Sequence, residues 1–176
     1  MDARAESDVA ATENRTTVER KSERELVIRR TINGPARIVF GAWSKPEIMK
    51  GWWVPKSACM TVLSWDMDVR VGGKYRLVFK HPAAPEPMAF FGSYREVTPH
   101  SRIVWTNEEA GPDRVSVTTA TFEEQGGKTL LVVSELHPSK EALDEAMASG
   151  MEAGTCESYE QLEELVATLV ASAGRS

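Results

Sequence analysis

Six strand-like segments, separated by short spacers rich in turn residues, constrain this sequence more than any other feature. They are rich in β-branched and aromatic residues, and the spacers hold the glycine and proline combinations typical of turns. Because parallel strands need crossover connections of a dozen residues or more, such short spacers predict hairpins and an antiparallel meander. The segments are 57–65, 74–80, 88–97, 102–108, 114–124 and 128–135.

Other patterns flank the meander on both sides. A strand is expected over 25–32 and two short apolar helices over 36–43 and 47–53. After the meander, apolar residues recur every three or four positions over 139–171, which predicts one long helix capped by Ser139. The expected fold class is α+β, in the order strand, helix, helix, six strands, helix.

The length of 176 residues suggests one domain, which we place at 25–171. The segment 1–24 is polar, carries charges of both signs and has no aromatic residue. Such a segment cannot bury enough apolar surface to offset the entropy of ordering, so we expect a disordered N-terminal tail.

Charge and hydropathy exclude several classes of protein. A formal net charge of −5 and a pI near 5.3 argue against binding to nucleic acid or to anionic membranes. No apolar run is long enough to insert into a membrane, and residues 1–24 lack the apolar region of a signal peptide. A cytoplasmic location is the default expectation.

Several motifs occur in an order that resembles a known family. A double-tryptophan turn is followed by a strand–GG–strand hairpin, a second hairpin, and a glycine-containing last helix. The matching segments are 52–56, 68–76, 92–99 with 102–105, 121–129, and 150–162. Together they resemble the activator of heat-shock protein 90 ATPase-like family, within the START-like (SRPBCC) superfamily.

The resemblance implies a helix-grip (START/Bet v-like) fold, in which a curved antiparallel sheet surrounds a long C-terminal helix and leaves a cavity between them. Members of the superfamily bind hydrophobic ligands, carry out cyclase-type chemistry or act as co-chaperones. Relatives often have tryptophan after the second glycine of the last helix, where this chain has Thr155. The smaller side chain should leave more room in the cavity.

The residues themselves also support a cavity. The chain has five tryptophans, whose apolar body and single polar atom suit a cavity wall. A row of small residues, Ala146, Gly150, Gly154 and Ser158, favours either close packing of the last helix on the sheet or space for a guest. The candidate ligand-binding residues are Trp52, Trp53, Trp65, Tyr75, Phe79, Phe91, Tyr94, Trp105, Met147, Met151, Thr155 and Tyr159.

No catalytic motif is apparent. His81, His100 and His137 each adjoin a proline or a turn, so we expect them to be solvated. Glu96 and Glu135 lie on predicted strands and are the candidates for a buried acid or base, although outward-facing side chains are the first expectation. We therefore predict no catalytic residues, no metal site and no cofactor.

The leading hypothesis is a module that binds a hydrophobic or aromatic small molecule between the sheet and the last helix. An enzyme of polyketide cyclase or small-molecule hydrolase type is the first alternative, since such enzymes work largely by shaping a substrate. Stimulation of heat-shock protein 90 ATPase is the second alternative. A chaperone partner is not expected, because residues 1–24 are too short for the separate chaperone-binding module that eukaryotic members carry.

Overall fold

The computed structural model describes residues 15–173; the part of the expected tail that covers residues 1–14 lies outside the described residues. Its centre is an eight-stranded antiparallel sheet in the order β1-β2-β8-β7-β6-β5-β4-β3. The strands are β1 Thr17–Arg20, β2 Glu25–Ile32, β3 Thr61–Met67, β4 Lys74–Lys80, β5 Met88–Thr98, β6 Arg102–Asn107, β7 Ser116–Gln125 and β8 Lys128–Leu136. Consecutive strands from β3 to β8 pair with one another, which confirms the predicted meander.

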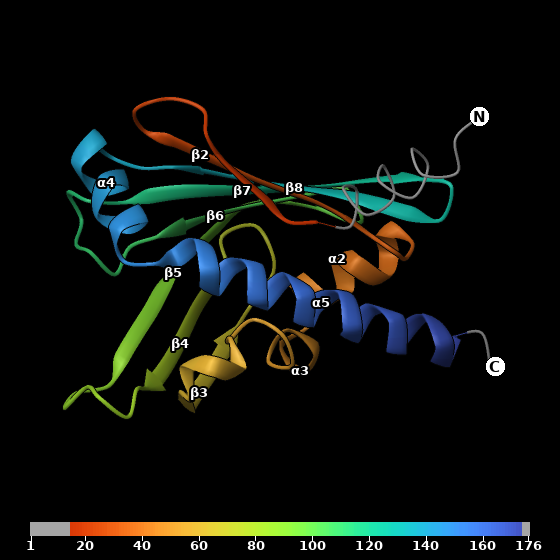
Figure 1. Cartoon of the computed structure of the whole chain (residues 1–176), viewed down its shortest axis with the longest axis horizontal. Helices are drawn as coiled ribbons and strands as arrows, with labels where there is room; N and C mark the ends of the chain where they lie inside the picture. Colours follow the sequence, from red (N-terminus) through yellow and green to blue (C-terminus); the bar gives the residue numbers. More distant parts are fainter. Residues whose placement is uncertain (1–14, 174–176) are drawn as a thin grey trace.

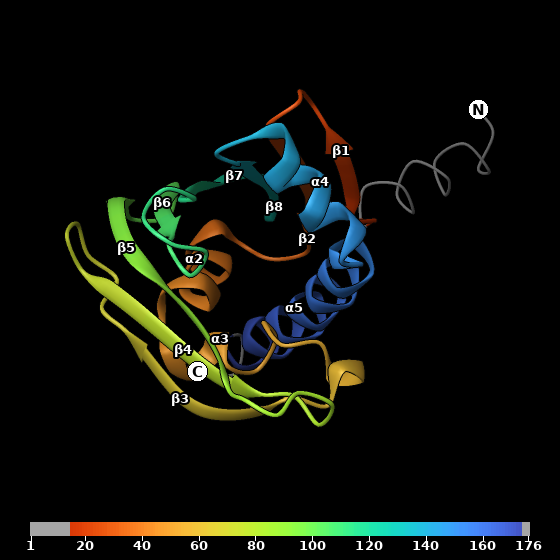
Figure 2. The same cartoon turned by 90° about the vertical axis from the view of Figure 1, so that its left-hand side faces the viewer.

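The sheet is strongly curved. Viewed along the molecule, the strands form an arc from β3 through β6 to β2 (Figure 2). A register shift between Tyr94 and Glu96 interrupts the pairing of β5 with β6, and bulges of this kind bend a strand. A Cβ atom on Gly92 would lie 2.0 Å from the carbonyl oxygen of Thr106, so only glycine allows β5 to approach β6 this closely.

The helices lie on the concave side of the arc (Figures 1 and 2). They are α2 Ala36–Ser44, α3 Pro46–Met49, a short 3-10 helix Lys56–Ala58, α4 Lys140–Ala148 and α5 Met151–Ala173. Helix α5 runs along the length of the sheet, and the curved sheet surrounds it as the helix-grip prediction requires. No helix within residues 15–173 is both long and apolar enough to span a membrane.

The prediction of one unbroken C-terminal helix is wrong. Helix α4 begins with the expected cap, in which the Ser139 hydroxyl accepts a hydrogen bond from the amide of Ala142. It ends at Ala148, and Gly150 adopts a φ of +81°, a left-handed conformation that commonly ends helices. The apolar spacing continues across this break, so periodicity alone did not reveal it.

The predicted disordered tail is also partly wrong. Within residues 15–24, β1 pairs with β2 and extends the edge of the sheet. Ion pairs hold this short polar strand in place, because Arg20 contacts Asp144 at 2.6 Å and Glu19 contacts Arg29 at 3.1 Å. Asp144 is distant in sequence from Arg20, and Arg29 lies on the strand paired with that of Glu19, so composition within the segment did not reveal either ion pair.

Two smaller boundaries differ from the prediction. The strand expected over 57–65 starts only at Thr61, because Cys59 takes a left-handed φ of +53° after the 3-10 helix. The helix expected over 47–53 is the shorter α3, and the chain then turns at Trp52 and Trp53.

The core lies between the concave face of the sheet and the helices. Alternate residues of β8 illustrate the pattern, since Thr129, Leu131 and Val133 are all buried. By the same alternation, Glu135 is the next residue on that face. The inner face of the sheet therefore changes from apolar to polar toward the end of β8.

Candidate functional site

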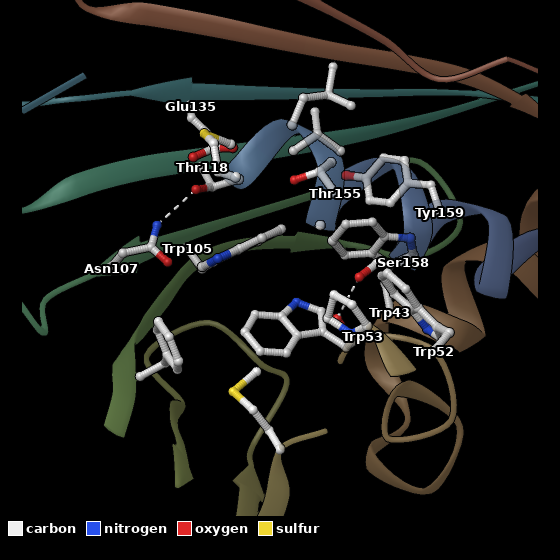
Figure 3. Close-up of a pocket in the computed structure, with 17 residues that line it drawn as sticks. Trp43, Trp52, Trp53, Trp105, Asn107, Thr118, Glu135, Thr155, Ser158 and Tyr159 are labelled. Carbon is white, nitrogen blue, oxygen red and sulfur yellow. Dashed lines mark hydrogen bonds between the residues drawn. The ribbon is translucent and has the colours of Figure 1, made fainter. Parts of the chain in front are cut away.

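A cavity of about 300 Å³ lies between α5 and the concave face of the sheet (Figure 3). Strands β2, β6, β7 and β8 contribute Ile28, Trp105, Thr118 and Val133 to its lining, and the segment after α3 contributes Trp52 and Trp53. A cavity at this position is the feature that the helix-grip prediction required.

Aromatic rings form most of one side of the cavity. The Trp43 ring lies 4.8 Å from Trp52, 5.7 Å from Trp105 and 6.1 Å from Tyr159, measured between centroids. Trp53 stacks on Phe79 at 5.7 Å with nearly parallel planes, so the residue behind it fixes its orientation. Since each ring packs against others, the aromatic side is a preformed surface.

Hydrogen bonds fasten the double-tryptophan turn to α5. The Gln161 side-chain amide donates to the carbonyls of Trp52 and Val54, each at 2.9 Å. The Ser158 hydroxyl donates to the Trp53 carbonyl at 2.9 Å. The indole N–H of Trp52 donates to the Ala42 carbonyl at 2.9 Å, so hydrogen bonds hold both the backbone and the ring of this residue.

The first half of α5 closes the cavity with small or flexible side chains. Met151, Gly154, Thr155 and Ser158 all line it. A Cβ atom at Gly154 would meet only the Pro55 ring, at 3.7 Å, so this glycine is not required by close packing. Of the two explanations for the row of small residues, space beside the helix fits Gly154, whereas Gly150 ends α4.

The opposite end of the cavity is polar. Glu135, Thr118 and Asn107 gather there, away from the tryptophans that surround Tyr159 (Figure 3). The Asn107 amide donates to the Thr118 hydroxyl at 2.8 Å. The Asn107 carbonyl oxygen lies 3.1 Å from the Tyr75 hydroxyl, whose single proton it shares with the nearer Thr106 carbonyl at 2.6 Å.

Among residues 15–173, Glu135 is the one carboxylate that lines the cavity, and its side chain is 22% exposed. Its Oε1 lies 3.5 Å from Nε2 of His137, which makes no hydrogen bond with a described residue. Burial raises the pKa of Tyr159 well above its ordinary value, and the negative charge of Glu135 raises that pKa further. The carboxylate therefore acts electrostatically on the aromatic side of the cavity.

A second, polar hollow of about 330 Å³ adjoins this end and shares Asn107 with the main cavity. Glu109, Arg114, His137 and Glu145 line it. Arg114 and Glu145 form an ion pair at 2.9 Å. Burial raises the pKa of Glu109, although backbone hydrogen bonds oppose this shift.

Two predicted tyrosines lie beyond the tryptophans. Tyr75 and Tyr94 line a small cavity of about 50 Å³, which shares Trp43, Trp53 and Trp105 with the main one. The Tyr75 hydroxyl donates to the Thr106 carbonyl at 2.6 Å. Burial raises the pKa of both phenols above the ordinary value, so they remain neutral hydrogen-bonding groups.

The twelve predicted ligand-binding residues fall into separate groups. The main cavity brings together Trp52, Trp53, Trp105, Met151, Thr155 and Tyr159. Trp65 and Phe79 are buried behind Trp53, and Tyr75 and Tyr94 line the small cavity.

Phe91 and Met147 are placed elsewhere. Phe91 lies beneath the Arg76 guanidinium at 5.9 Å, and its neighbour Phe90 lines the cavity instead. Met147 belongs to α4, is 38% exposed and lies near Arg20. Glu135, Gly154, Ser158 and Trp43 also line the cavity; the sequence pointed to them as a possible acid, as members of the small-residue row and as one of the five tryptophans, but not as ligand-binding residues. The lining residues that the sequence did not point to are Ile28, Pro55, Met60, Phe90, Asn107, Thr118 and Val133.

The expected exposure of the histidines and carboxylates holds only in part. His137 is not solvated, since its side chain is 11% exposed. His100 is exposed as expected, and its ring also packs edge-on against Phe40 at 5.7 Å. Glu96 pairs with Arg102 at the surface, whereas Glu135 faces the cavity. Among residues 15–173, no group of three or more His, Cys, Asp or Glu side chains is arranged to hold a metal ion.

Comparison with known proteins extends these observations. A family model described as "Activator of Hsp90 ATPase homolog 1-like protein" matches residues 33–167. A crystal structure of a Nitrosomonas europaea protein is 23% identical, covers 86% of this chain and 99% of its own, and has a TM-score of 0.74. A crystal structure of a Rhodobacter sphaeroides protein is 19% identical, covers 88% of this chain and 99% of its own, and has a TM-score of 0.78.

A solution structure from Staphylococcus epidermidis is also similar, with 26% identity, coverage of 86% of this chain and 94% of that one, and a TM-score of 0.71. The comparison with curated proteins returned no match. The solved structures therefore agree with the helix-grip architecture, and the family model covers the cavity-forming part of the chain from α2 to most of α5.

Proposed function

Because the chain belongs to the activator of Hsp90 ATPase homolog 1-like family, whose model covers most of its length, we propose that it binds a hydrophobic or aromatic small molecule between the sheet and α5. The observation that carries this proposal is the cavity of about 300 Å³ with Trp43, Trp52, Trp53 and Trp105 in its lining. Concave, largely apolar sites with a few polar groups are typical of small-molecule binding.

The expected ligand is compact. The small cavity behind Trp53 and Trp105 adds only about 50 Å³, so a long chain would need these rings to move.

Binding can be tested with compact neutral probes such as 2-naphthol and 1-naphthalenemethanol. A bound probe should raise Tm by mass action and change the fluorescence of the tryptophans that line the cavity. Thr155→Trp should fill the space and remove both effects. Thr168→Trp is the matched control, since Thr168 is exposed on the same helix and the substitution is identical.

The proposal predicts that Thr168→Trp responds like the unmodified chain. Lack of any response to the probes would count against binding in the cavity. An undiminished response of Thr155→Trp would place binding elsewhere on the protein.

A second candidate function is enzymatic conversion of the ligand, of the cyclase or hydrolase type. It is favoured by the position of Glu135 in the cavity lining, 3.5 Å from a largely buried histidine, because a carboxylate and an imidazole can transfer protons. Incubation with 2-naphthyl acetate, followed by mass spectrometry, would detect hydrolysis by water to 2-naphthol and acetate. Loss of product with retained binding in His137→Asn would assign the histidine to the chemistry.

A further inference from the structure

The polar end of the cavity offers negative charge and hydrogen-bond acceptors. Glu135 continues the inward-facing register of Leu131 and Val133, so its carboxylate is directed to the concave side of the sheet by the pleat of β8. It lines the same cavity as the tryptophans (Figure 3). Among the described residues 15–173, no lysine or arginine lines this cavity.

The protein does not neutralise Glu135 with a permanent cation. Within residues 15–173, the ion pairs of arginine and lysine go to other carboxylates, and the one basic neighbour of Glu135 is His137 at 3.5 Å. Nε2 of His137 does not reach hydrogen-bonding geometry with the carboxylate. The Glu135 oxygens therefore remain open to a further donor from the cavity.

The charges near Glu135 do not suit an anionic ligand. One N–H of the Asn107 amide is directed to the Thr118 hydroxyl, and the donors left at this end, the second Asn107 N–H and the Thr118 O–H, carry no charge. The adjoining hollow adds Glu109 and Glu145, with Arg114 paired to Glu145. A ligand carboxylate would meet like charge here, whereas a ligand cation would meet opposite charge.

The aromatic side of the cavity suits a cation as well. Faces of tryptophan attract ammonium groups within about 6 Å of the ring centroid, and the attraction increases when the groups are removed from water. Trp105 lies in the cavity between the polar end and the other aromatic rings (Figure 3). Aromatic rings next to one carboxylate form the combination that recognises organic cations.

We propose that the ligand is an aromatic or compact apolar molecule with a positively charged nitrogen, and that Glu135 is its counter-ion beside the tryptophan rings. This inference depends on the proposed function, because it assigns the ligand class of the same cavity. The charged nitrogen lies at the Glu135 end, and the apolar part lies among Trp43, Trp53 and Tyr159.

Three probes of similar shape test the charge requirement. Benzyltrimethylammonium is the cation, (2,2-dimethylpropyl)benzene replaces its nitrogen by carbon, and 3-phenylpropionate is an anion. Isothermal titration calorimetry on the full chain should show the cation binding about tenfold or more tightly than the anion. Benzyltrimethylammonium has no N–H, so Glu135 attracts it through charge alone. Glu135→Gln should therefore weaken the cation by about tenfold and change the neutral probe by less than about twofold.

Glu96→Gln is the matched control, since Glu96 lies on β5 and pairs with Arg102 at the surface. It should leave the affinities for all three probes unchanged. If Glu135→Gln does not fold, as judged by circular dichroism, the inference is tested with the unmodified chain, by the order of its affinities for the three probes.

The outcomes separate the inference from the proposed function. Tight binding of the neutral probe without preference for the cation, or equal weakening of both by Glu135→Gln, would overturn the cation assignment and leave hydrophobic binding intact. Failure of all three probes, together with failure of the neutral naphthalene compounds, would overturn the binding proposal itself.

Discussion

The two halves of α5 meet the rest of the protein in opposite ways. In the second half, Leu162 and Val166 are fully buried and belong to the main hydrophobic core. In the first half, Gly154, Thr155 and Ser158 present small side chains toward the sheet, and a cavity of about 300 Å³ remains. One helix therefore supplies both the attachment to the core and one side of the candidate binding site.

The junction between the halves is held by polar groups. Ser158 and Gln161 bind the carbonyls of Trp52, Trp53 and Val54, so the double-tryptophan turn is fixed where the cavity ends and the core begins. The contrast between the two halves shows that the cavity lies beside a helix that is firmly packed at its other end. It persists because the second half and the junction determine the position of the first half.

The largest effect should come from a change in the attached half. Leu162→Ala removes a fully buried side chain and should lower the free energy of unfolding by about 2–5 kcal/mol. Met151→Ala, in the first half, removes a side chain that is only partly buried and lines the cavity, so its cost should be clearly smaller. Urea denaturation followed by circular dichroism measures both, and equal losses would contradict the distinction between the halves.

A smaller effect, with the opposite sign, is expected at Gly154. A Cβ atom there meets only Pro55 at 3.7 Å, so Gly154→Ala should raise the free energy of unfolding by up to about 1 kcal/mol through helix propensity. It should also weaken binding of a cavity probe, because the methyl group occupies free space.

Gly34→Ala is the contrasting control for Gly154→Ala. Its Cβ atom would lie 2.6 Å from Cγ1 of Val166, which is fully buried and has little room to move. Thermal melts should therefore show Gly34→Ala destabilised and Gly154→Ala stabilised. Destabilisation by Gly154→Ala would mean that the first half of α5 is packed as tightly as the second.

Most of the fold could be predicted from the sequence because turn residues mark the ends of most strands. The bounds of β2 and β4 agree with the prediction, since clear turn residues delimit them. β1 could not be recognised in this way. Arg20 is paired with Asp144, which only the folded chain brings close, and Glu19 is paired with Arg29 on the adjacent strand β2.

The candidate site was less predictable because it depends on which face each side chain occupies. Because side chains alternate along a strand, Phe90, and not Phe91, lies on the same face of β5 as Tyr94. The sequence of β5 was therefore sufficient to replace Phe91 by Phe90 as the cavity residue. The same alternation places Glu135 with Leu131 and Val133. The separation of α5 from the sheet has no such local signal, because small residues suit close packing as well as a cavity.

The smallest expected effect concerns α4, which lies beyond the break at Gly150 and precedes the cavity half of α5. Asp144 on α4 joins β1 through Arg20 at 2.6 Å and also contacts Lys140 at 3.0 Å. The hydrogen bond from Arg20, followed by that from Lys140, lowers the pKa of Asp144. A carboxyl group whose pKa is lower in the folded state stabilises the fold above its unfolded pKa, and this contribution disappears as the pH falls through the folded pKa.

Asp144→Asn should therefore lower Tm slightly at neutral pH, and less at high salt, because exposed ion pairs are screened. The difference from the unmodified chain should vanish in acid, below the ordinary pKa range of aspartate. Asp113→Asn is the matched control, since Asp113 is exposed and forms no ion pair within residues 15–173. A Tm difference for Asp144→Asn that stayed constant from neutral to acidic pH would show that the amide alters packing, and that the charge of Asp144 does not join β1 to α4.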